Sequence, residues 1–159
     1  MIILGIDPGT ATTGYALIEC IDNHHTKLIC ADAILTPTGQ KLEHRLEEIY
    51  NSITTLIKNY KPDALAIEAL FFARNVKTAI SVSHARGVMI LAGAVNQVPV
   101  FEYTPLQIKQ AVTGYGKADK KQVIQMLKYF IKNQELTTQD DTCDAIACAL
   151  THAQTINIK

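Results

Sequence analysis

Two acidic residues each end a short apolar run, where a carboxylate is hard to accommodate. Asp7 follows the run 2–6 and precedes the turn Pro8-Gly9, and Glu68 closes the run 64–67. At the tip of a buried strand a carboxylate loses hydration and repels neighbouring carboxylates, so its charged form is costly unless a cation compensates it. Taken alone, Asp7 is better explained as a turn residue. Glu68 is harder to explain structurally, because Glu is poor in strands.

A second acidic pair lies near the C-terminus. Asp141 and Asp144 stand three residues apart, just before the apolar or small stretch 145–150. That spacing places both carboxylates on one face of a predicted helix, where like charges are mildly destabilising unless a cation lies between them. Asp141 has an alternative role, because residues 138–141 fit a capping box that starts the helix. If the fold brings the two pairs together, the four acids outline a metal site.

The chemistry that four grouped carboxylates suit is hydrolysis of a phosphodiester. This reaction needs an activated water molecule and stabilisation of the departing 3′ oxygen, and two Mg²⁺ ions about 4 Å apart supply both. Magnesium prefers hard oxygen ligands, whereas a His or Cys cluster would be the wrong set for it. The five histidines are scattered and the four cysteines form no C-x-x-C pair, so we expect reduced thiols and no zinc site. For His152 two roles stay open: a charge at a helix C-terminus, or a place near the site.

The formal net charge is zero, but the charges are unevenly distributed. Residues 1–73 carry five basic residues (Lys or Arg) and nine acidic ones (Asp or Glu). Residues 74–128 carry eight basic and two acidic residues, and residues 129–159 carry two basic and four acidic residues. A basic middle flanked by acidic ends can present a phosphate-binding face, because the local field steers a polyanion. A merely solvated basic surface explains the same distribution equally well.

Candidate nucleic-acid contacts lie in two basic loops. Phe71-Phe72 directly follows the second acidic strand, and Arg74 comes soon after. An exposed aromatic side chain there can stack on a base, and core burial of either ring is the equal alternative. Lys117 lies in a second basic segment, 114–117, whose glycines predict a flexible turn.

Periodicity and turn residues predict the elements that must position these side chains. We expect strands at 2–7, 13–20, 27–36, 64–68 and 98–103, and helices at about 42–56, 75–97, from Pro105 onward, 119–131 and 140–155. They indicate one α/β domain over residues 1–159, with a mixed five-stranded sheet flanked by helices. No stretch approaches the ~20 apolar residues of a membrane span. The first apolar run lacks the basic flank of a signal peptide, so we expect a cytoplasmic protein.

The predicted helix 75–97 is apolar or small on more than one side, which suggests contact with a second copy. Its larger apolar residues are Val76, Ile80, Val88, Ile90 and Leu91, and its small ones are Ala79, Ala85, Gly87, Ala92 and Gly93. One face can cover the sheet while another meets its twin, with the small residues allowing close approach. Complete burial within one chain is the alternative.

Several ordered motifs resemble the RuvC family of Holliday-junction resolvases (crossover junction endodeoxyribonucleases), which have an RNase H-like fold. The matching segments run nearly from end to end: Gly5-Ile6-Asp7-Pro8-Gly9, Ala66-Ile67-Glu68, Phe71-Phe72-Ala73-Arg74-Asn75, Ala85-Arg86-Gly87-Val88, Phe101-Glu102-Tyr103-Thr104-Pro105, Ile108-Lys109, Gly114-Tyr115-Gly116-Lys117-Ala118-Asp119-Lys120 and Asp141-Thr142-Cys143-Asp144. An isolated Asp-Pro-Gly motif is weak evidence for this family, but the full set of motifs in this order, in a chain of this length, is specific evidence for it.

The resemblance implies a role for each of the singled-out residues. The family's four catalytic and metal-binding carboxylates fall on Asp7, Glu68, Asp141 and Asp144, the last being His in some members. Its junction-probing aromatic falls on Phe71, and its phosphate-contacting lysines fall on Lys109 and Lys120. The resemblance also implies Mg²⁺ dependence, a homodimer that makes paired nicks in four-way DNA junctions during homologous recombination and repair, and the RuvA and RuvB branch-migration proteins as partners.

Three other classes share part of these features. A YqgF-type ribosomal-RNA-processing nuclease shares the first motif, but those proteins are usually shorter and lack this form of the C-terminal acidic helix. An ATP-binding domain of the actin and hexokinase type has an Asp-x-Gly loop like 7–9, but it needs two related domains, and 159 residues are too few. A non-catalytic junction-binding module is disfavoured, because four carboxylates near DNA repel phosphate unless metal is present.

Overall fold

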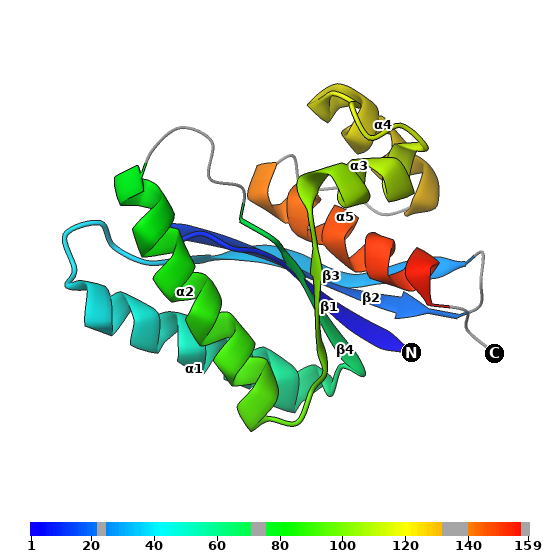
Figure 1. The fold of residues 1–159 in the computed structure, drawn as a ribbon. Helices are drawn as coiled ribbons and strands as arrows, with labels where there is room; N and C mark the ends of the chain where they lie inside the picture. The colour runs from blue at the N-terminus through cyan, green and yellow to red at the C-terminus, as the bar shows by residue number, and fades with distance from the viewer. Residues whose placement is uncertain (22–24, 71–75, 132–139, 157–159) are drawn as a thin grey trace.

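The computed structural model describes residues 1–21, 25–70, 76–131 and 140–156. Its elements, in chain order, are β1 (Ile2–Asp7), β2 (Thr12–Cys20), β3 (Thr26–Leu35), α1 (Leu42–Tyr60), β4 (Ala64–Glu68), α2 (Val76–Val95), β5 (Val100–Tyr103), α3 (Pro105–Thr113), α4 (Lys120–Phe130) and α5 (Asp140–Thr155). The strands form one sheet in the order β3-β2-β1-β4-β5 (Figure 1). Its β1–β2 and β2–β3 pairs are antiparallel, and its β1–β4 and β4–β5 pairs are parallel. This confirms the predicted mixed five-stranded sheet.

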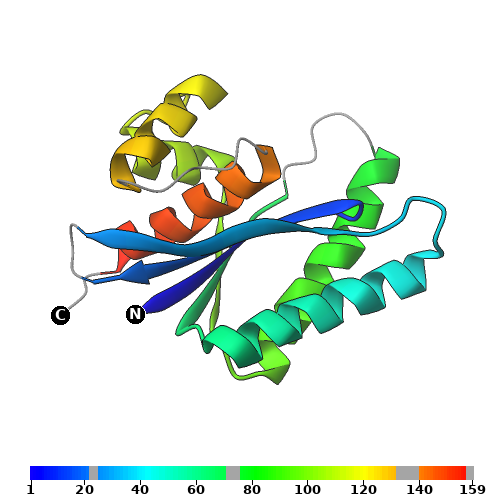
Figure 2. The same cartoon turned by 180° about the vertical axis from the view of Figure 1, so that it is seen from behind.

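Helices cover both faces of the sheet. Figures 1 and 2 show α1 and α2 on one face, and α5 on the other with α3 and α4 packed beyond it. Within β1, Leu4 and Ile6 belong to the apolar cluster under α1 and α2, whereas Ile3 belongs to the cluster under α5. Because β1 is buried on both faces, its sequence is apolar without alternation.

The parallel pairing of β1 and β4 determines where their terminal acids lie. The last residue pair between these strands is Ile6 with Ile67, so Asp7 and Glu68 follow it side by side. Parallel strands bring their carboxyl ends to the same edge of a sheet. The side chains at positions 7 and 68 point to the α5 face, because strand side chains alternate and their neighbours Ile6 and Ile67 pack under α1 and α2.

Two glycines let α5 lie almost in backbone contact with the sheet. A Cβ added to Gly5 would lie 2.2 Å from the carbonyl oxygen of Ala145, and one added to Gly14 would lie 2.0 Å from that of Asp141. Gly14 is also the partner of Asp7 in the β1–β2 ladder. The absence of a side chain at Gly14 therefore allows the first turn of α5 to lie over the end of β1.

Capping interactions fix the starts of α3 and α4. Thr104 caps α3 and Asp119 caps α4, each in a complete capping box with a Gln three residues later. The turn between these helices, which was predicted to be flexible, is bridged by the side chain of one residue. The Gln110 side chain accepts from the backbone of Gly116 at 2.9 Å and donates to the carbonyl oxygen of Gly114 at 2.8 Å.

The remaining differences from the predicted elements lie at their ends. The helix predicted over 75–97 is α2, which ends at Val95, and the strand predicted from residue 98 begins at Val100. Gln97 takes a left-handed conformation with φ of 60° and so ends the helix. Within the described ranges no helix has the length and apolar character needed to span a membrane.

Candidate active site

The four predicted acids come together from three distant segments. Asp7 ends β1, Glu68 ends β4, and Asp141 and Asp144 lie in the first turns of α5. All four interact electrostatically, because Asp7 is affected by Glu68, Asp144 and Asp141. The structure thus places the candidate carboxylates in one region, at the edge of the sheet where β1 and β4 end.

Burial and mutual repulsion change the acidity of the two strand-end carboxyl groups. The pKa of Asp7 is raised to about 7, first by burial and then by Glu68, Asp144 and Asp141, with Lys120 opposing the shift. The pKa of Glu68 is also raised to about 7, by burial and then by Asp144, with Lys109 and Lys120 opposing. Without a further cation, both groups therefore hold protons close to neutral pH.

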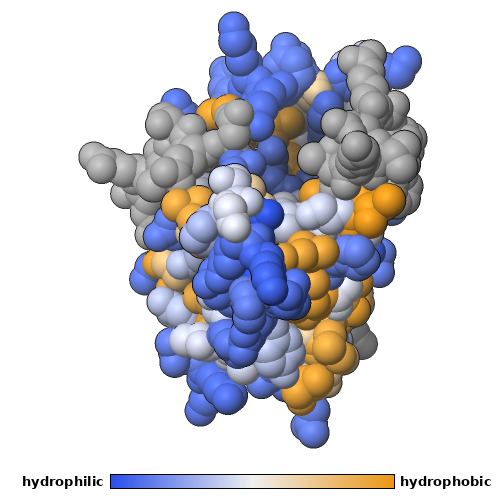
Figure 3. Space-filling view, turned by 90° about the vertical axis from the view of Figure 1, so that its left-hand side faces the viewer, coloured by the Kyte–Doolittle hydropathy of each residue, from blue (hydrophilic) through white to orange (hydrophobic). Residues whose placement is uncertain are grey.

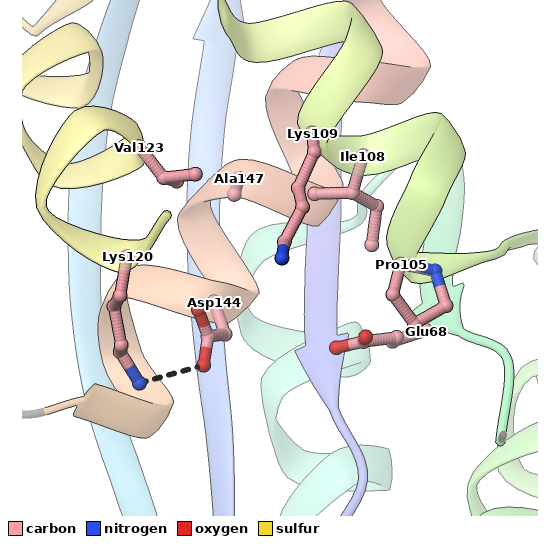
Figure 4. A pocket seen from close by; sticks show the side chains of 8 residues that line it. All are labelled: Glu68, Pro105, Ile108, Lys109, Lys120, Val123, Asp144 and Ala147. Carbon is pink, nitrogen blue, oxygen red and sulfur yellow. Dashed lines mark hydrogen bonds and ion pairs between the residues drawn. The ribbon is translucent and has the colours of Figure 1, made fainter. Parts of the chain in front are cut away.

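A cleft of about 190 Å³ opens beside these acids. Its polar lining is Glu68, Asp144, Lys109 and Lys120, and its apolar lining is Pro105, Ile108, Val123 and Ala147. Figure 4 shows the Lys109 side chain, from α3, reaching into the cleft between Glu68 and Asp144. Lys120, at the start of α4, places its Nζ 3.2 Å from Oδ2 of Asp144. The cleft therefore joins acids and bases above an apolar floor.

The acids are near enough to repel one another, but they do not surround a single point. Among the described residues, no three His, Cys, Asp or Glu side chains form a ready-made metal site, and Asp144 is paired with Lys120. The donor chemistry nevertheless fits a hard divalent cation, because all four side chains offer carboxylate oxygens. The raised pKa values of Asp7 and Glu68 mark the excess negative charge that such a cation would relieve.

The predicted DNA contacts are placed differently. Lys109 and Lys120 line the cleft. Lys117 is exposed in the turn between α3 and α4 and is not part of the cleft lining. Phe71 and Arg74 lie outside the described residues, so their contacts with DNA stay predictions.

His152 is a buried core residue, which bears on one of the two roles left open for it, that of a charge. Its side chain is 2% exposed, and its Nδ1 lies 2.7 Å from the Tyr103 hydroxyl group. Burial lowers the pKa of His152, so it is not the expected charge at a helix C-terminus. Cys148 lies on the same helix, and burial raises the pKa of its thiol well above the usual value. All four cysteines are free thiols.

Sequence reasoning missed the role of Arg86 and the apolar floor of the cleft. The Arg86 Nε donates to the backbone carbonyl oxygen of Glu68 at 3.2 Å, and the Arg86 Nη2 pairs with the Glu102 carboxylate. A signal was available, because Arg86 is a single Arg in a stretch of mostly small and apolar residues. The floor residues Ile108 and Val123 gave no comparable signal, because their spacing predicts only the buried side of a helix.

Comparisons with known proteins agree with this geometry. Residues 3–152 match the family model described as crossover junction endodeoxyribonuclease RuvC. A protein of that name from Desulforamulus reducens is 51% identical over 97% of this chain and 94% of its own length. Its namesake from Clostridioides difficile is 52% identical over 96% of this chain and 90% of its own length.

A solved structure, T. thermophilus RuvC in complex with a Holliday junction substrate, superimposes with a TM-score of 0.92 and 30% identity. The match covers 98% of this chain and 94% of that one. The T. thermophilus protein has the RNase H-like fold that the motifs imply, and the mixed sheet described above follows it. Because its motifs and topology match and about half of its residues are identical to those of the D. reducens and C. difficile proteins, the chain belongs to the RuvC family of crossover junction endodeoxyribonucleases.

Proposed function

We propose that this chain is a metal-dependent endonuclease that resolves four-way DNA junctions by paired nicks during homologous recombination and repair. In this proposal residues 1–159 form one nuclease domain that works in the cytoplasm. The observation that carries it is the convergence of four carboxylates beside a cleft lined by two lysines. The names of its relatives and the junction bound to the T. thermophilus protein support the choice of substrate.

Asp7, Glu68, Asp141 and Asp144 are the residues that would hold two Mg²⁺ ions. Such ions, when bound, activate water and stabilise the departing 3′ oxygen. The chain's own contribution is a set of hard oxygen ligands in which Asp7 and Glu68 have pKa values near 7. These two groups must therefore release protons when a cation binds, which makes binding dependent on pH.

Lys109 and Lys120 are suited to bind the DNA phosphates on either side of the cleaved phosphodiester bond. Both line the cleft from the α3 and α4 side, opposite the strand ends that carry the acids. The ion pair of Lys120 with Asp144 is partly exposed, so a phosphate can replace Asp144 as the partner of the ammonium group. The Asp144 carboxylate is then available to a cation.

A homodimer would supply the two sites that paired nicks require, because a two-fold axis repeats one site. Along α2, Ile80, Leu91 and Val95 are each more than half exposed. Figure 3 shows apolar surface on the side of the molecule where α2 lies. The predicted small residues divide between two faces: Ala85, Ala92 and Gly93 are buried against the chain's own core, whereas Gly87 is exposed. In this proposal RuvA and RuvB act as partner proteins, as in the family.

The deciding experiment uses a synthetic four-way junction with and without Mg²⁺, with linear duplex and fork DNA of the same sequence as controls. We expect symmetric nicks in the junction only when Mg²⁺ is present, and much slower cutting of the controls. Equal cutting of duplex and junction would contradict the proposed substrate. Junction cutting at the full rate in EDTA would contradict the proposed role of the carboxylates.

A further inference from the structure

Helix α2 is hydrogen-bonded to both segments that carry the first two carboxylates. Arg86 contacts the backbone of Glu68 at the end of β4. Five residues earlier, Ser81 contacts Thr10, which lies in the loop that follows Asp7. Because five residues span about 1.4 turns of a helix, these two side chains leave α2 on different sides of its buried face.

The peptide group that follows Glu68 is bonded on both sides. Its N–H, which belongs to Ala69, donates to the Tyr103 carbonyl oxygen of β5 at 2.8 Å, and Arg86 bonds its carbonyl oxygen beyond the ladder with β1. The last residue pair between β1 and β4 is Ile6 with Ile67, so that ladder stops one residue short. The Arg86 Nε then donates to the Glu68 carbonyl oxygen at 3.2 Å. The same guanidinium group pairs with Glu102, which lies opposite Ile67 in β5. With only 18% of its side chain exposed, Arg86 ties β4, β5 and α2 together.

The contact of Ser81 likewise belongs to a small hydrogen-bonded group, which is centred on Thr10. The two hydroxyl groups are 2.8 Å apart, and the carbonyl oxygen of Thr10 accepts from Thr36 at 2.6 Å. Thr10 is 7% exposed and Thr36 is 5% exposed. The loop that leaves Asp7 is therefore bonded both to α2 and to the segment before α1.

We propose that Arg86 is a positioning residue that fixes the location of the Glu68 carboxylate. It acts from α2, the helix that also carries the exposed apolar residues Ile80 and Leu91. This inference rests on the proposed function, because it concerns the role of Glu68 as a ligand of Mg²⁺. A shift of the Glu68 peptide moves its side chain relative to Asp7 and Asp144. Ser81 helps to hold the loop that follows Asp7 in the same way, through a hydrogen bond between uncharged groups, which is weaker.

The test compares Arg86→Lys, Arg86→Gln and Glu102→Gln with the full-length wild-type protein. One readout is the Mg²⁺ concentration at half-maximal junction cleavage, and the other is the shift of the melting temperature by Mg²⁺ without DNA. For the Arg86 variants we expect the Mg²⁺ midpoint to rise about tenfold or more, as for the loss of a group that orients a metal ligand. Junction binding in EDTA should stay within about twofold, because phosphate contacts elsewhere carry it.

The Arg86→Lys variant distinguishes a positioning role of Arg86 from a purely electrostatic one. Arg86→Lys keeps the charge beside Glu102 but loses the fork that bonds two partners at once, so it should be as defective as Arg86→Gln. Recovery of the wild-type midpoint by Arg86→Lys would overturn the inference. A matched control is Ile53→Val in the core under α1 and α2, which costs about 1 kcal/mol of stability and should leave the Mg²⁺ midpoint unchanged.

The remaining outcomes also decide the question. If the Arg86 variants do not fold, Glu102→Gln, an exposed change, should raise the Mg²⁺ midpoint in the same direction by a smaller factor. An unchanged midpoint for Glu102→Gln would then overturn the inference. If the wild type does not cut a junction, the proposed function fails by itself, and the melting shift by Mg²⁺ still reports whether Arg86 positions Glu68.

Discussion

Asp7 and Glu68 hold protons in the metal-free protein at pH values where ordinary carboxyl groups are ionised. Both pKa values are raised to about 7, and burial is the largest cause for each. Burial and the closeness of other carboxylates favour the binding of a cation, and they make the ionised form of these side chains costly when no cation is bound.

Asp7→Asn, Glu68→Gln and Asp141→Asn should each abolish junction cleavage while junction binding is unchanged or tighter. Each change removes one oxygen ligand, and the loss of metal-assisted catalysis lowers the rate by many powers of ten. Binding does not weaken, because the loss of negative charge reduces repulsion of DNA phosphate. Single-turnover cleavage and gel-shift titration measure the two effects. Near-wild-type cleavage by any one variant would remove that residue from the site.

The metal-free protein should become less stable as the pH rises from 5 to 8. Asp7 has a pKa of about 7 in the fold against an ordinary value of 3.8, so its stabilising proton is lost as the pH passes through 7. Thermal unfolding in EDTA measures this dependence. Asp7→Asn should reduce this dependence to the share that Glu68 contributes, and it should stabilise the metal-free protein at pH 8 by on the order of 1 to 3 kcal/mol. With Mg²⁺ the dependence should reverse, because the ligands must be deprotonated to bind.

Lys109→Ala and Lys120→Ala should each weaken junction binding and reduce its salt dependence. Each phosphate contact that is lost lowers the log–log slope by about one. Lys58→Ala is the matched control, because this lysine lies in the last turn of α1 and does not line the cleft. Wild-type slopes for both cleft variants would assign these lysines to ordinary surface charge.

At the scale of elements, the strands and helices were predictable because their signals are local. The apolar runs before Asp7 and Glu68 predicted β1 and β4, and Thr104-Pro105 predicted the start of α3, as the structure confirms. The meeting of the acids was an inference from chemistry. The parallel pairing of β1 and β4 accounts for the two strand-end acids, and the close packing of α5 on the sheet accounts for the other two.

Contacts between elements could not be predicted in the same way. The bond between Arg86 and the Glu68 carbonyl oxygen joins positions 18 residues apart, and helical periodicity does not say which neighbour an inward side chain meets. The role of His152 is ambiguous in the sequence for the same reason, because its partner Tyr103 lies 49 positions away. Lys120 and Asp144 are 24 residues apart, so only the packing of α4 on α5 brings them together.

The close approach of α5 gives a prediction at this scale. Gly14→Ala should lower both stability and cleavage, because the new Cβ would lie 2.0 Å from the Asp141 carbonyl oxygen and must push the first turn of α5 away. We expect a loss of several kcal/mol or a shift of α5 that separates Asp141 from Asp7. Gly39→Ala is the control, because nothing lies within 4 Å of its added Cβ. Equal melting temperatures and rates for both variants would show that the packing of α5 is not tight.

At the scale of the whole molecule, the proposed homodimer would form through the exposed face of α2. Leu91→Glu places a charge in the middle of the face formed by Ile80, Leu91 and Val95, so it should shift the protein from dimer to monomer. Light scattering at micromolar concentration measures the change. Exposed Leu35→Glu, at the end of β3, is the control for a new surface charge. A wild-type protein that is monomeric both alone and on a junction would contradict a paired-nick mechanism.

The site is divided among the beginning, the middle and the end of the chain, and this has a consequence for biosynthesis. Asp141 and Asp144 belong to α5, which starts at residue 140 of 159. A growing chain on the ribosome therefore has β1 and β4, with their two acids, long before the other two exist. Helix α5 must then close onto Gly5 and Gly14 before all four are neighbours. In the proposed mechanism, which needs all four acids, chains that end before α5 would therefore be unable to cut DNA, and nuclease activity would arise only from finished, folded molecules.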